Sequence, residues 1–259
     1  MAVYDYEYFK KEILALTKID LNAYKENQMK RRIDALIAKN KIKGYENFVK
    51  AVKVDKKLFE DFVNYLTINV SEFYRNPDQW QVLDKDVFPY LIKKFGKNLK
   101  IWSAACSTGD EPYSLVMALA EHVPLNNIKI FATDIDKQVI EKAKVGLYSA
   151  KSIASVPDKL KKKYFTQVGA SYRISDEVKA RVEFKESNLL KDTYPTGCHM
   201  IVCRNVLIYF TEEAKDSVFM KFQKSLAKGG ILFIGSTEQI MNYKNMGYGR
   251  MNSFFYIAE

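Results

Sequence analysis

The sequence predicts an α/β protein made of an N-terminal helical domain and a doubly wound domain that carries a small antiparallel β insertion. Apolar residues recur at helical spacing, without an alternating segment, over residues 5–66. From Leu99 onward, apolar strands alternate with amphipathic helices, which is typical of a mostly parallel sheet. Short β segments around a glycine turn interrupt this alternation over residues 146–186. We therefore predict domains over residues 1–70 and 71–259, a linker over 71–79 and an insertion over about 147–186.

The composition excludes several classes of chemistry. The three cysteines are odd in number and lack metal-ligand spacing, and the two histidines lack a partner motif such as H-E-x-x-H. We therefore expect reduced thiols, no metal site and no Ser-His-Asp site. No run is long and apolar enough to span a bilayer, and the first residues are too charged for a signal peptide. We expect a cytoplasmic protein without direct membrane insertion.

The net charge of +10 predicts an acidic partner, which is nucleic acid, an anionic membrane or an acidic protein surface. The helix expected over residues 21–39 is the informative part of the first domain. At about 100° per residue, its apolar side chains gather on one side, and Arg31, Arg32 and Lys39 lie on the other. Such a basic face suits an acidic helix or phosphate groups, and the alternative is an ordinary solvated face.

Residues 67–77 mix polar side chains with adjacent aromatic ones. They lead into a helix that we expect to begin with Asn76 as its N-cap and Pro77 at its first position. This segment is predicted to be a lid or a crossing between the domains, and an ordinary linker is the alternative.

A turn of small residues follows the first strand of the second domain, over residues 103–109. Such a turn brings backbone N–H groups and a helix N-terminus close to a ligand. A pyrophosphate is disfavoured because only Gly109 is present where the dinucleotide motif needs three glycines. The carboxylates of Asp110 and Glu111 would also repel it. A cationic ligand without phosphate, such as S-adenosylmethionine, fits better, and an ordinary βα turn is the alternative.

Polar residues also follow the later strands. Asp134 ends the second strand, where an acid is placed to bind both ribose hydroxyls of a nucleoside. Asn188 follows another strand and is placed to contact an adenine edge. Asn205 and Tyr209 follow the buried strand that begins at Met200, at the edge where chemistry occurs in an open parallel sheet.

The C-terminal part of the chain is expected to complete the sheet. A helix over residues 212–227 is predicted to end at a glycine cap over 228–230, and a strand over 231–235 follows. The last strand is expected over residues 253–257. These assignments give about seven strands, one or two of them antiparallel at this edge.

Four motifs occur in a specific order along the chain. They are N-V-S-E-F-Y-R from Asn69, W-S-A-A-C-S-T-G-D-E-P-Y from Trp102, T-D-I-D from Thr133 and C-R-N-V-L-I-Y-F from Cys203. Together they closely resemble the motifs of the chemotaxis receptor methyltransferases, the CheR family. The resemblance extends from the N-terminal helices to the last strand, and it implies a Rossmann-like S-adenosylmethionine-dependent methyltransferase domain.

This resemblance implies methyl transfer from S-adenosylmethionine to the γ-carboxylate of specific glutamates on the cytoplasmic helices of chemoreceptors, with S-adenosylhomocysteine as the product. The insertion corresponds to the family's β-subdomain. Its turn at residues 169–171 is shorter than in members that bind a receptor's C-terminal pentapeptide tether, so we do not expect tether binding. The positions that match the family's cofactor contacts are Asn69, Ser71, Arg75, Glu111, Asp134, Asn188, Leu189, Asn205 and Val206.

The expected catalytic residues are Arg75 and Tyr209. A glutamate side chain, with an ordinary pKa of about 4.3, is already ionised at neutral pH, so the reaction needs no general base. Arg75 either positions the substrate carboxylate or clamps the methionine carboxylate of the cofactor, and Tyr209 orients the substrate through its hydroxyl. The basic face of Arg31, Arg32 and Lys39 is expected to dock the acidic receptor helices.

Two rival functions have distinct sequence requirements. A nucleic-acid methyltransferase suits the positive charge, but the sequence lacks the N/D-P-P-Y/F motif of amino-group methylation, so nucleic acid is not expected as a partner. A non-catalytic S-adenosylmethionine-binding signalling module is the other rival, and the presence of Arg75 and Tyr209 favours an enzyme.

Overall fold

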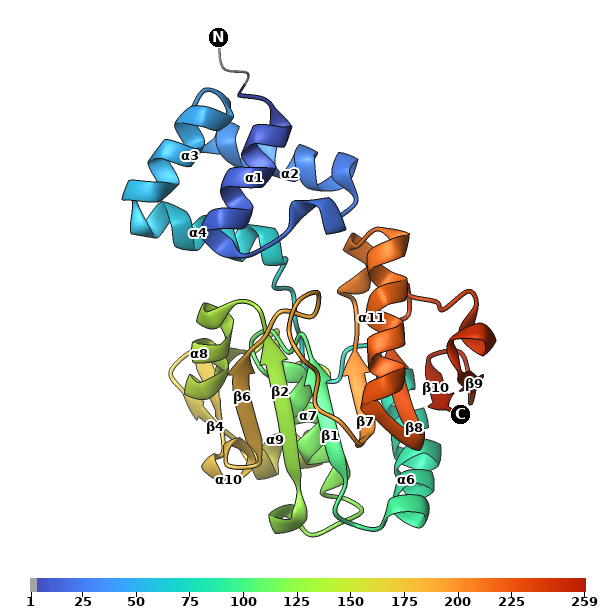
Figure 1. Cartoon of the computed structure of the whole chain (residues 1–259). Helices are drawn as coiled ribbons and strands as arrows, with labels where there is room; N and C mark the ends of the chain where they lie inside the picture. The colour runs from blue at the N-terminus through green and yellow to red at the C-terminus, as the bar shows by residue number, and fades with distance from the viewer. Residues whose placement is uncertain (1–3) are drawn as a thin grey trace. The chain divides into compact units, whose positions relative to one another are not determined.

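Four helices form most of a helical unit in the computed structural model, which describes residues 4–259 (Figure 1). They are α1 (Tyr6–Thr17), α2 (Glu26–Lys39), α3 (Gly44–Val54) and α4 (Lys56–Thr67). Asp5 caps α1 by accepting a hydrogen bond from the backbone N–H of Tyr8 at 3.0 Å. The apolar faces of the helices meet in a core of fully buried side chains, which includes Phe9, Ile13, Ile33, Phe48 and Phe62. The predicted helical domain is confirmed.

The prediction of one continuous helix over residues 21–39 is wrong. A short 3-10 turn, η1 (Leu21–Ala23), comes first, and the backbone is extended at Tyr24 before α2 begins. Tyr24 needs this extended conformation because it forms an isolated antiparallel bridge with Phe210. Their rings also meet edge to face, with centroids 5.0 Å apart.

A segment from late in the chain therefore belongs to the helical unit. The backbone N–H of Lys25 donates to the carbonyl of Tyr209 at 2.9 Å, and the N–H of Thr211 donates to the carbonyl of Ala23 at the same distance. The helical unit consequently ends at Asn69 and then includes Ile208–Asp216. The sequence analysis placed its boundary at residue 70 and missed the later segment, because local periodicity carries no information about such a pairing.

The second unit, called the sheet unit, comprises Val70–Leu207 and Ser217–Glu259. It begins with α5 (Pro77–Val82), the π-helical turn η2 (Leu83–Val87) and α6 (Phe88–Phe95). Pro77 takes the first position of α5 as predicted, but the side chain of Asn76 does not cap the helix. The backbone of Asn76 is left-handed, with φ +60°, and its side-chain oxygen accepts a hydrogen bond from Arg204 at 3.1 Å instead.

The large sheet has seven strands in the spatial order β6-β2-β1-β7-β8-β10-β9. The strands are β1 (Lys100–Ala104), β2 (Lys129–Asp134), β6 (Val182–Glu186), β7 (Cys198–Cys203), β8 (Leu226–Ile234), β9 (Tyr248–Arg250) and β10 (Phe255–Ala258). The strands from β6 to β8 are parallel, and β10 runs antiparallel to both β8 and β9. The predicted sheet, with antiparallel strands at its C-terminal edge, is confirmed.

The strand order changes direction at β1, which pairs with β2 on one side and with β7 on the other. In open α/β sheets, ligands bind outside the carboxyl ends of the strands at such a switch point. In Figure 1, α7 (Asp110–Leu119) lies behind the sheet and α11 (Glu212–Ser225) lies in front of it. The ring of Trp102 on β1 accordingly contacts that of Phe222 on α11, with centroids 5.5 Å apart.

The remaining elements of the sheet unit connect these strands. They are α8 (Lys137–Val145) and the 3-10 turns η3 (Leu125–Asn127) and η5 (Tyr243–Met246). A further turn, η4 (Leu207–Tyr209), begins at the last residue of this segment of the sheet unit and continues in the helical unit. The predicted glycine cap over residues 228–230 is wrong, because α11 ends at Ser225 and β8 begins at Leu226. Pairing of Leu226 with Cys198 on β7 extends the strand, and a register shift follows before Met200.

The insertion holds its own antiparallel sheet, in the order β3-β5-β4. Its elements are β3 (Leu147–Ser149), α9 (Asp158–Tyr164), β4 (Phe165–Val168), β5 (Ser171–Ile174) and α10 (Asp176–Lys179). The predicted hairpin is confirmed, and it turns at Gly169, with φ +60°. The prediction that residues 182–186 belong to the insertion is wrong, because they form β6 in the large sheet. Phe184 of β6 packs against Tyr113 of α7, which holds this strand at the sheet edge.

Two features are absent from residues 4–259. No helix in this range has both the length and the apolar character that crossing a membrane requires. The same residues contain no cluster of histidine, cysteine, aspartate and glutamate side chains suited to hold a metal ion.

Candidate functional site

The turn after β1 contains residues in an unfavourable backbone conformation. Ala105 and Ser107 have φ values of +68° and +47°, in the left-handed region that side chains other than glycine rarely adopt. Hydrogen bonds to the end of β2 hold this turn, and one runs from the N–H of Cys106 to the carbonyl of Thr133 at 2.8 Å. Backbone strain of this kind clusters at functional sites, so the turn marks a candidate site at the carboxyl end of β1.

Asp134, at the end of β2, lies beside this turn. One carboxylate oxygen accepts a hydrogen bond from the N–H of Ser107 at 2.8 Å, and the other accepts one from the N–H of Asp136 at 3.0 Å. Burial raises the pKa of Asp134 to about 6, although the backbone hydrogen bonds oppose this shift. The carboxylate is therefore fixed in place, and it ionises close to neutral pH.

Glu111 lies in the first turn of α7. One of its carboxylate oxygens accepts a hydrogen bond from the Ser103 hydroxyl at 2.8 Å, and the other is 3.7 Å from Nη1 of Arg204. Burial raises the pKa of Glu111, while Arg204 and the Ser103 hydrogen bond lower it. A buried carboxylate that is only loosely paired has acceptor capacity left for a cationic ligand.

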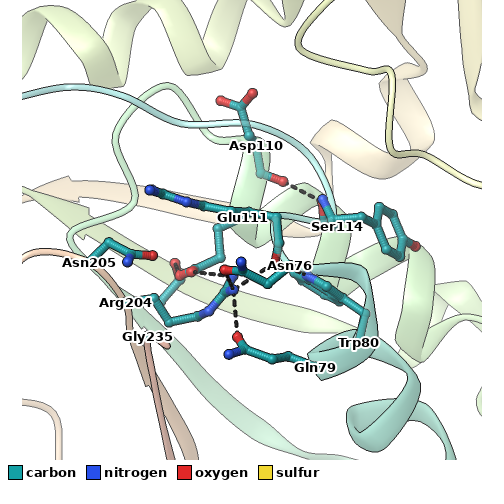
Figure 2. A network of polar contacts seen from close by, with 12 residues as sticks. Asn76, Gln79, Trp80, Asp110, Glu111, Ser114, Arg204, Asn205 and Gly235 are labelled. Atoms are coloured by element: carbon teal, nitrogen blue, oxygen red, sulfur yellow. Dashed lines mark hydrogen bonds and ion pairs between the residues drawn. The ribbon is translucent and has the colours of Figure 1, made fainter. Parts of the chain in front are cut away.

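Arg204, directly after β7, is the centre of the polar network in Figure 2. Its Nη2 donates to the main-chain carbonyl of Arg75 at 2.6 Å and to the side-chain oxygens of Asn76 and Gln79 at 3.1 and 2.8 Å. The side chain of Arg75 donates to the carbonyl of Val70 at 3.3 Å. The network joins the predicted linker to the end of β7. The sequence analysis included Arg204 only as part of a motif and gave it no role.

Asn205 follows Arg204 and also has a left-handed backbone, with φ +61°. A buried carboxylate, that of Glu238, holds this conformation by accepting hydrogen bonds from the backbone N–H groups of Asn205 and Val206 at 2.9 and 3.1 Å. The N–H groups of Leu207 and Gly235 donate to the same carboxylate at 2.9 and 2.7 Å. The sequence analysis missed Glu238, and no motif or spacing in the chain distinguishes this glutamate from an exposed one.

Two further predicted contact regions are in the sheet unit. The hydroxyls of Ser71 and Thr108 form hydrogen bonds to the buried carboxylate of Asp110, which oppose the rise in its pKa caused by burial. Asn188 forms a tight turn in which its side-chain oxygen accepts a hydrogen bond from the N–H of Leu190 at 2.9 Å. Leu189, between them, is buried.

Two predicted site residues belong to the helical unit. The side-chain amide of Asn69 donates to the hydroxyl of Thr67 at 2.8 Å. Tyr209 is half-buried, and its carbonyl accepts the hydrogen bond from Lys25 described above. The expected roles of Asn69 and Tyr209 therefore stay predictions from the sequence.

The predicted basic face of α2 needs a correction. Arg31 and Lys39 are exposed, as expected. Arg32 is instead directed into the helical unit, where it donates to the carbonyl of Tyr65 at 2.7 Å and lies over the Tyr65 ring at 4.6 Å. Arg32 binds a main-chain carbonyl in the last turn of α4, where a cation is favourable, so it is not a free surface charge.

Several buried polar atoms around the switch point lack a hydrogen-bond partner among the described residues. They are the hydroxyl of Ser107, Oδ1 of Asp110, Nε of Arg204 and Oδ1 of Asn205. Leaving such a group unpaired costs about 1–3 kcal/mol, so their concentration here indicates a polar ligand. The labelled view in Figure 2 shows Asp110, Arg204 and Asn205 in the same region.

The donor set fits the amino-acid and nucleoside ends of S-adenosylmethionine. Asp134 and Glu111 are acceptors for hydroxyl and ammonium groups, and Asn205 is an amide with an unpaired oxygen. Asp134 ends β2, and Glu111 lies in the helix that follows the adjacent strand β1, so both acids lie at the edge where a doubly wound sheet binds a nucleoside. Fold and site together define a Rossmann-like domain that binds a nucleoside-containing cofactor.

Comparison with known proteins gives the particular family. Residues 4–67 match the model of the CheR methyltransferase all-alpha domain, and residues 69–253 match that of the CheR methyltransferase SAM-binding domain. The chain therefore belongs to the CheR methyltransferase family, and it is an S-adenosylmethionine-dependent methyltransferase. This result confirms the expected cofactor and the expected enzyme class.

Individual relatives cover nearly the whole chain. A chemotaxis protein methyltransferase of Listeria innocua is 41% identical over 98% of this chain and 97% of the relative. Chemotaxis protein methyltransferase 1 of Pseudomonas aeruginosa is 32% identical over 92% of this chain and 91% of the relative. A chemotaxis protein methyltransferase of Borreliella burgdorferi is 31% identical over 89% of this chain and 86% of the relative.

Proposed function

We propose that this enzyme transfers a methyl group to the γ-carboxylate of glutamate side chains on the cytoplasmic helices of chemoreceptors, and that it acts in the cytoplasm. The observation that carries the proposal is a site whose described residues include buried carboxylates and no histidine. His122 pairs with Asp84 at 2.6 Å, and His199 accepts a hydrogen bond from the N–H of Lys100 at 3.0 Å, so neither histidine is in the described network. A carboxylate nucleophile needs no proton removed.

Bound S-adenosylmethionine supplies an electrophilic methyl group, and the protein's task is to position the groups around it. Glu111 is proposed to hold the cofactor's ammonium group, and Asp134 its ribose hydroxyls. The remaining cofactor contacts are proposed to come from Asn69, Ser71, Asn188, Leu189, Asn205 and Val206. Positioning alone is worth roughly 7–11 kcal/mol in well-oriented reactions, and a nucleophile that is already ionised needs no proton transfer beside it.

Arg75 has two proposed roles that the contacts leave open. Its main-chain carbonyl is fixed by Arg204 at 2.6 Å and by the indole N–H of Trp80 at 3.0 Å. Its guanidinium makes a long hydrogen bond of 3.3 Å to Val70, which a carboxylate ligand can replace. That carboxylate belongs either to the cofactor or to the substrate. The hydroxyl of Tyr209 is proposed to orient the substrate.

Receptor docking is proposed to use the exposed cations of α2, Arg31 and Lys39. The net charge of +10 favours an acidic partner surface, and complementary charges raise the association rate. The turn between β4 and β5 contains only two residues, Gly169 and Ala170. This short turn supports direct recognition of the receptor helices without a C-terminal tether.

The test is incubation of the enzyme with isotopically labelled S-adenosylmethionine and a receptor cytoplasmic fragment, followed by mass spectrometry of the receptor peptides. The expected result is a base-labile methyl ester on glutamate side chains. A parallel reaction with double-stranded DNA is expected to incorporate no label. Label on DNA, or on receptor residues other than glutamate, would contradict the proposed substrate.

A further inference from the structure

We propose that Arg204 is a positioning residue for methyl transfer, which fixes the main chain at Arg75 and the carboxylate of Glu111 in one arrangement. This inference rests on the proposed roles of Arg75 and Glu111 as ligands of the cofactor or the substrate. Arg204 itself is not proposed to touch either molecule. The expected effect of its loss is therefore indirect, through the two groups that it holds.

The first argument is the convergence of acceptors on one guanidinium. Nη2 of Arg204 is within 2.6–3.1 Å of three oxygens, and all of them come from the short segment between Arg75 and Gln79. Nη1 is 3.7 Å from the carboxylate of Glu111, on a different element. A guanidinium has several N–H donors in a fixed plane, whereas a lysine ammonium is a single point charge. The guanidinium therefore reaches the linker segment and Glu111 at the same time, through two different nitrogens.

The second argument is burial. The side chain of Arg204 is only 3% exposed, and its guanidinium lies over the rings of Phe233 and Trp80, at 4.7 and 5.9 Å. A charge in such a place is costly unless its partners compensate, and removal of one partner leaves the other charge or acceptor unpaired. Loss of Arg204 therefore removes the donor to the buried side-chain oxygen of Gln79, and the carbonyl of Arg75 keeps only the indole N–H of Trp80.

The third argument is backbone strain in the segment that Arg204 holds. Tyr74 and Asn76, on either side of Arg75, have φ values of +51° and +60°. Non-glycine residues in this region are unfavourable by about 1–3 kcal/mol each, and they persist only where surrounding contacts hold them. Arg204 supplies two of these contacts directly, through the carbonyl of Arg75 and the side chain of Asn76.

The fourth argument concerns the charge on Glu111. Burial raises the pKa of this carboxyl group, and Arg204 opposes the rise, with a smaller contribution from Arg75, while Glu238 adds to the rise. The 3.7 Å separation is longer than a bidentate pair, so Glu111 keeps acceptor sites for a ligand ammonium. Arg204 thus favours the ionised form of Glu111 and leaves some acceptor sites of its carboxylate unoccupied.

The experiment compares Arg204→Lys and Arg204→Met with the wild type by calorimetric titration of S-adenosylhomocysteine between pH 5.5 and 8.5. Arg250→Met removes an exposed cation from the same unit and is the matched control. We expect both Arg204 variants to bind the product about tenfold or more weakly at pH 7, with the control within twofold of the wild type. In Arg204→Met the loss should grow as the pH falls, because Glu111 then takes up its proton at a higher pH.

A double-mutant cycle separates positioning from general damage. Glu111→Gln alone is expected to weaken product binding. In the Arg204→Met background, the same substitution should cause a smaller further loss of affinity than it causes in the wild type. Full additivity, or wild-type affinity in Arg204→Met, would overturn the proposal. Where the Met variant does not fold, Arg204→Lys and Gln79→Met provide the same comparison with less disruption. Unchanged affinity in Glu111→Gln would instead contradict the proposed role of Glu111 in cofactor binding, whatever Arg204 does.

Discussion

The carboxylate of Asp134 accepts a hydrogen bond from the backbone N–H of Ser107 at 2.8 Å. This bond fastens the strained turn after β1 to the end of β2, and it keeps the carboxylate at the switch point of the sheet. Asp134 therefore has two functions in the proposed site. It supports the turn, and it is proposed to bind the ribose hydroxyls.

Product affinity is expected to depend on the ionisation of Asp134. Its pKa is about 6, so the carboxylate takes up a proton as the pH falls through this value and loses acceptor capacity. Affinity for S-adenosylhomocysteine, measured by calorimetry, should be nearly constant above about pH 7 and should decrease below pH 6. The Asp134→Asn variant should bind S-adenosylhomocysteine weakly at every pH, and its affinity should not decrease further below pH 6. Wild-type affinity in Asp134→Ala would contradict the ribose assignment.

Arg75→Ala is expected to abolish methylation while the protein stays folded. The fold depends on the main-chain carbonyl of Arg75, which the substitution keeps, whereas the side chain makes a single long hydrogen bond to Val70. We expect a loss of about 100-fold or more in kcat/KM, with little change in Tm. Titration with S-adenosylhomocysteine then decides the role. Weaker binding indicates the cofactor carboxylate, and unchanged binding indicates the substrate carboxylate.

Tyr209→Phe tests the proposed orienting hydroxyl. The contact that Tyr209 makes through its main chain, to Lys25, does not involve the hydroxyl, so the helical unit should keep its stability. We expect kcat with a receptor fragment to fall about tenfold and product affinity to stay unchanged. Turnover close to that of the wild type would remove the hydroxyl from the mechanism.

The cations of α2 allow a comparison within one helix, because Arg31 and Lys39 are exposed and Arg32 is directed into the helical unit. Charge reversal at the exposed positions, Arg31→Glu with Lys39→Glu, should raise KM for the receptor and flatten its salt dependence without changing cofactor affinity. Arg32→Glu should instead lower Tm, because Arg32 donates to the carbonyl of Tyr65. An unaltered KM in the double variant would mean that this face is only solvated.

Gly109 offers a test of packing at the turn. A Cβ at this position would lie 2.8 Å from Cβ of Ala143 and 3.0 Å from the ring of Tyr113, and φ is +87°. Gly169 also has positive φ, +60°, but its Cβ would meet nothing within 4 Å. In urea titrations, Gly109→Ala should therefore destabilise the protein by about 1–3 kcal/mol more than Gly169→Ala. Equal losses would show that the neighbours of Gly109 can move aside.

Much of the candidate site was predictable because its parts lie at the ends of strands. Asp134 and Glu111 were recognised from their positions after β2 and at the start of α7, and the turn between 103 and 109 from its small residues. Arg204 was not recognised, because its acceptor on Gln79 is 125 residues away in the chain. Glu238 was missed for the same reason, since three of its four backbone donors lie 31 to 33 residues earlier.

The sequence by itself determined the order of helices and strands, the antiparallel C-terminal edge and the cofactor class, because periodicity, caps and turn residues act over a few positions. Only the tertiary structure decided that Tyr24 breaks a helix, that residues 182–186 form an edge strand of the large sheet, and that Arg32 faces inward. The physical reason is that each of these outcomes depends on a partner far away in the chain. The strength of such a contact is set by burial and geometry, which the identity of one residue does not encode.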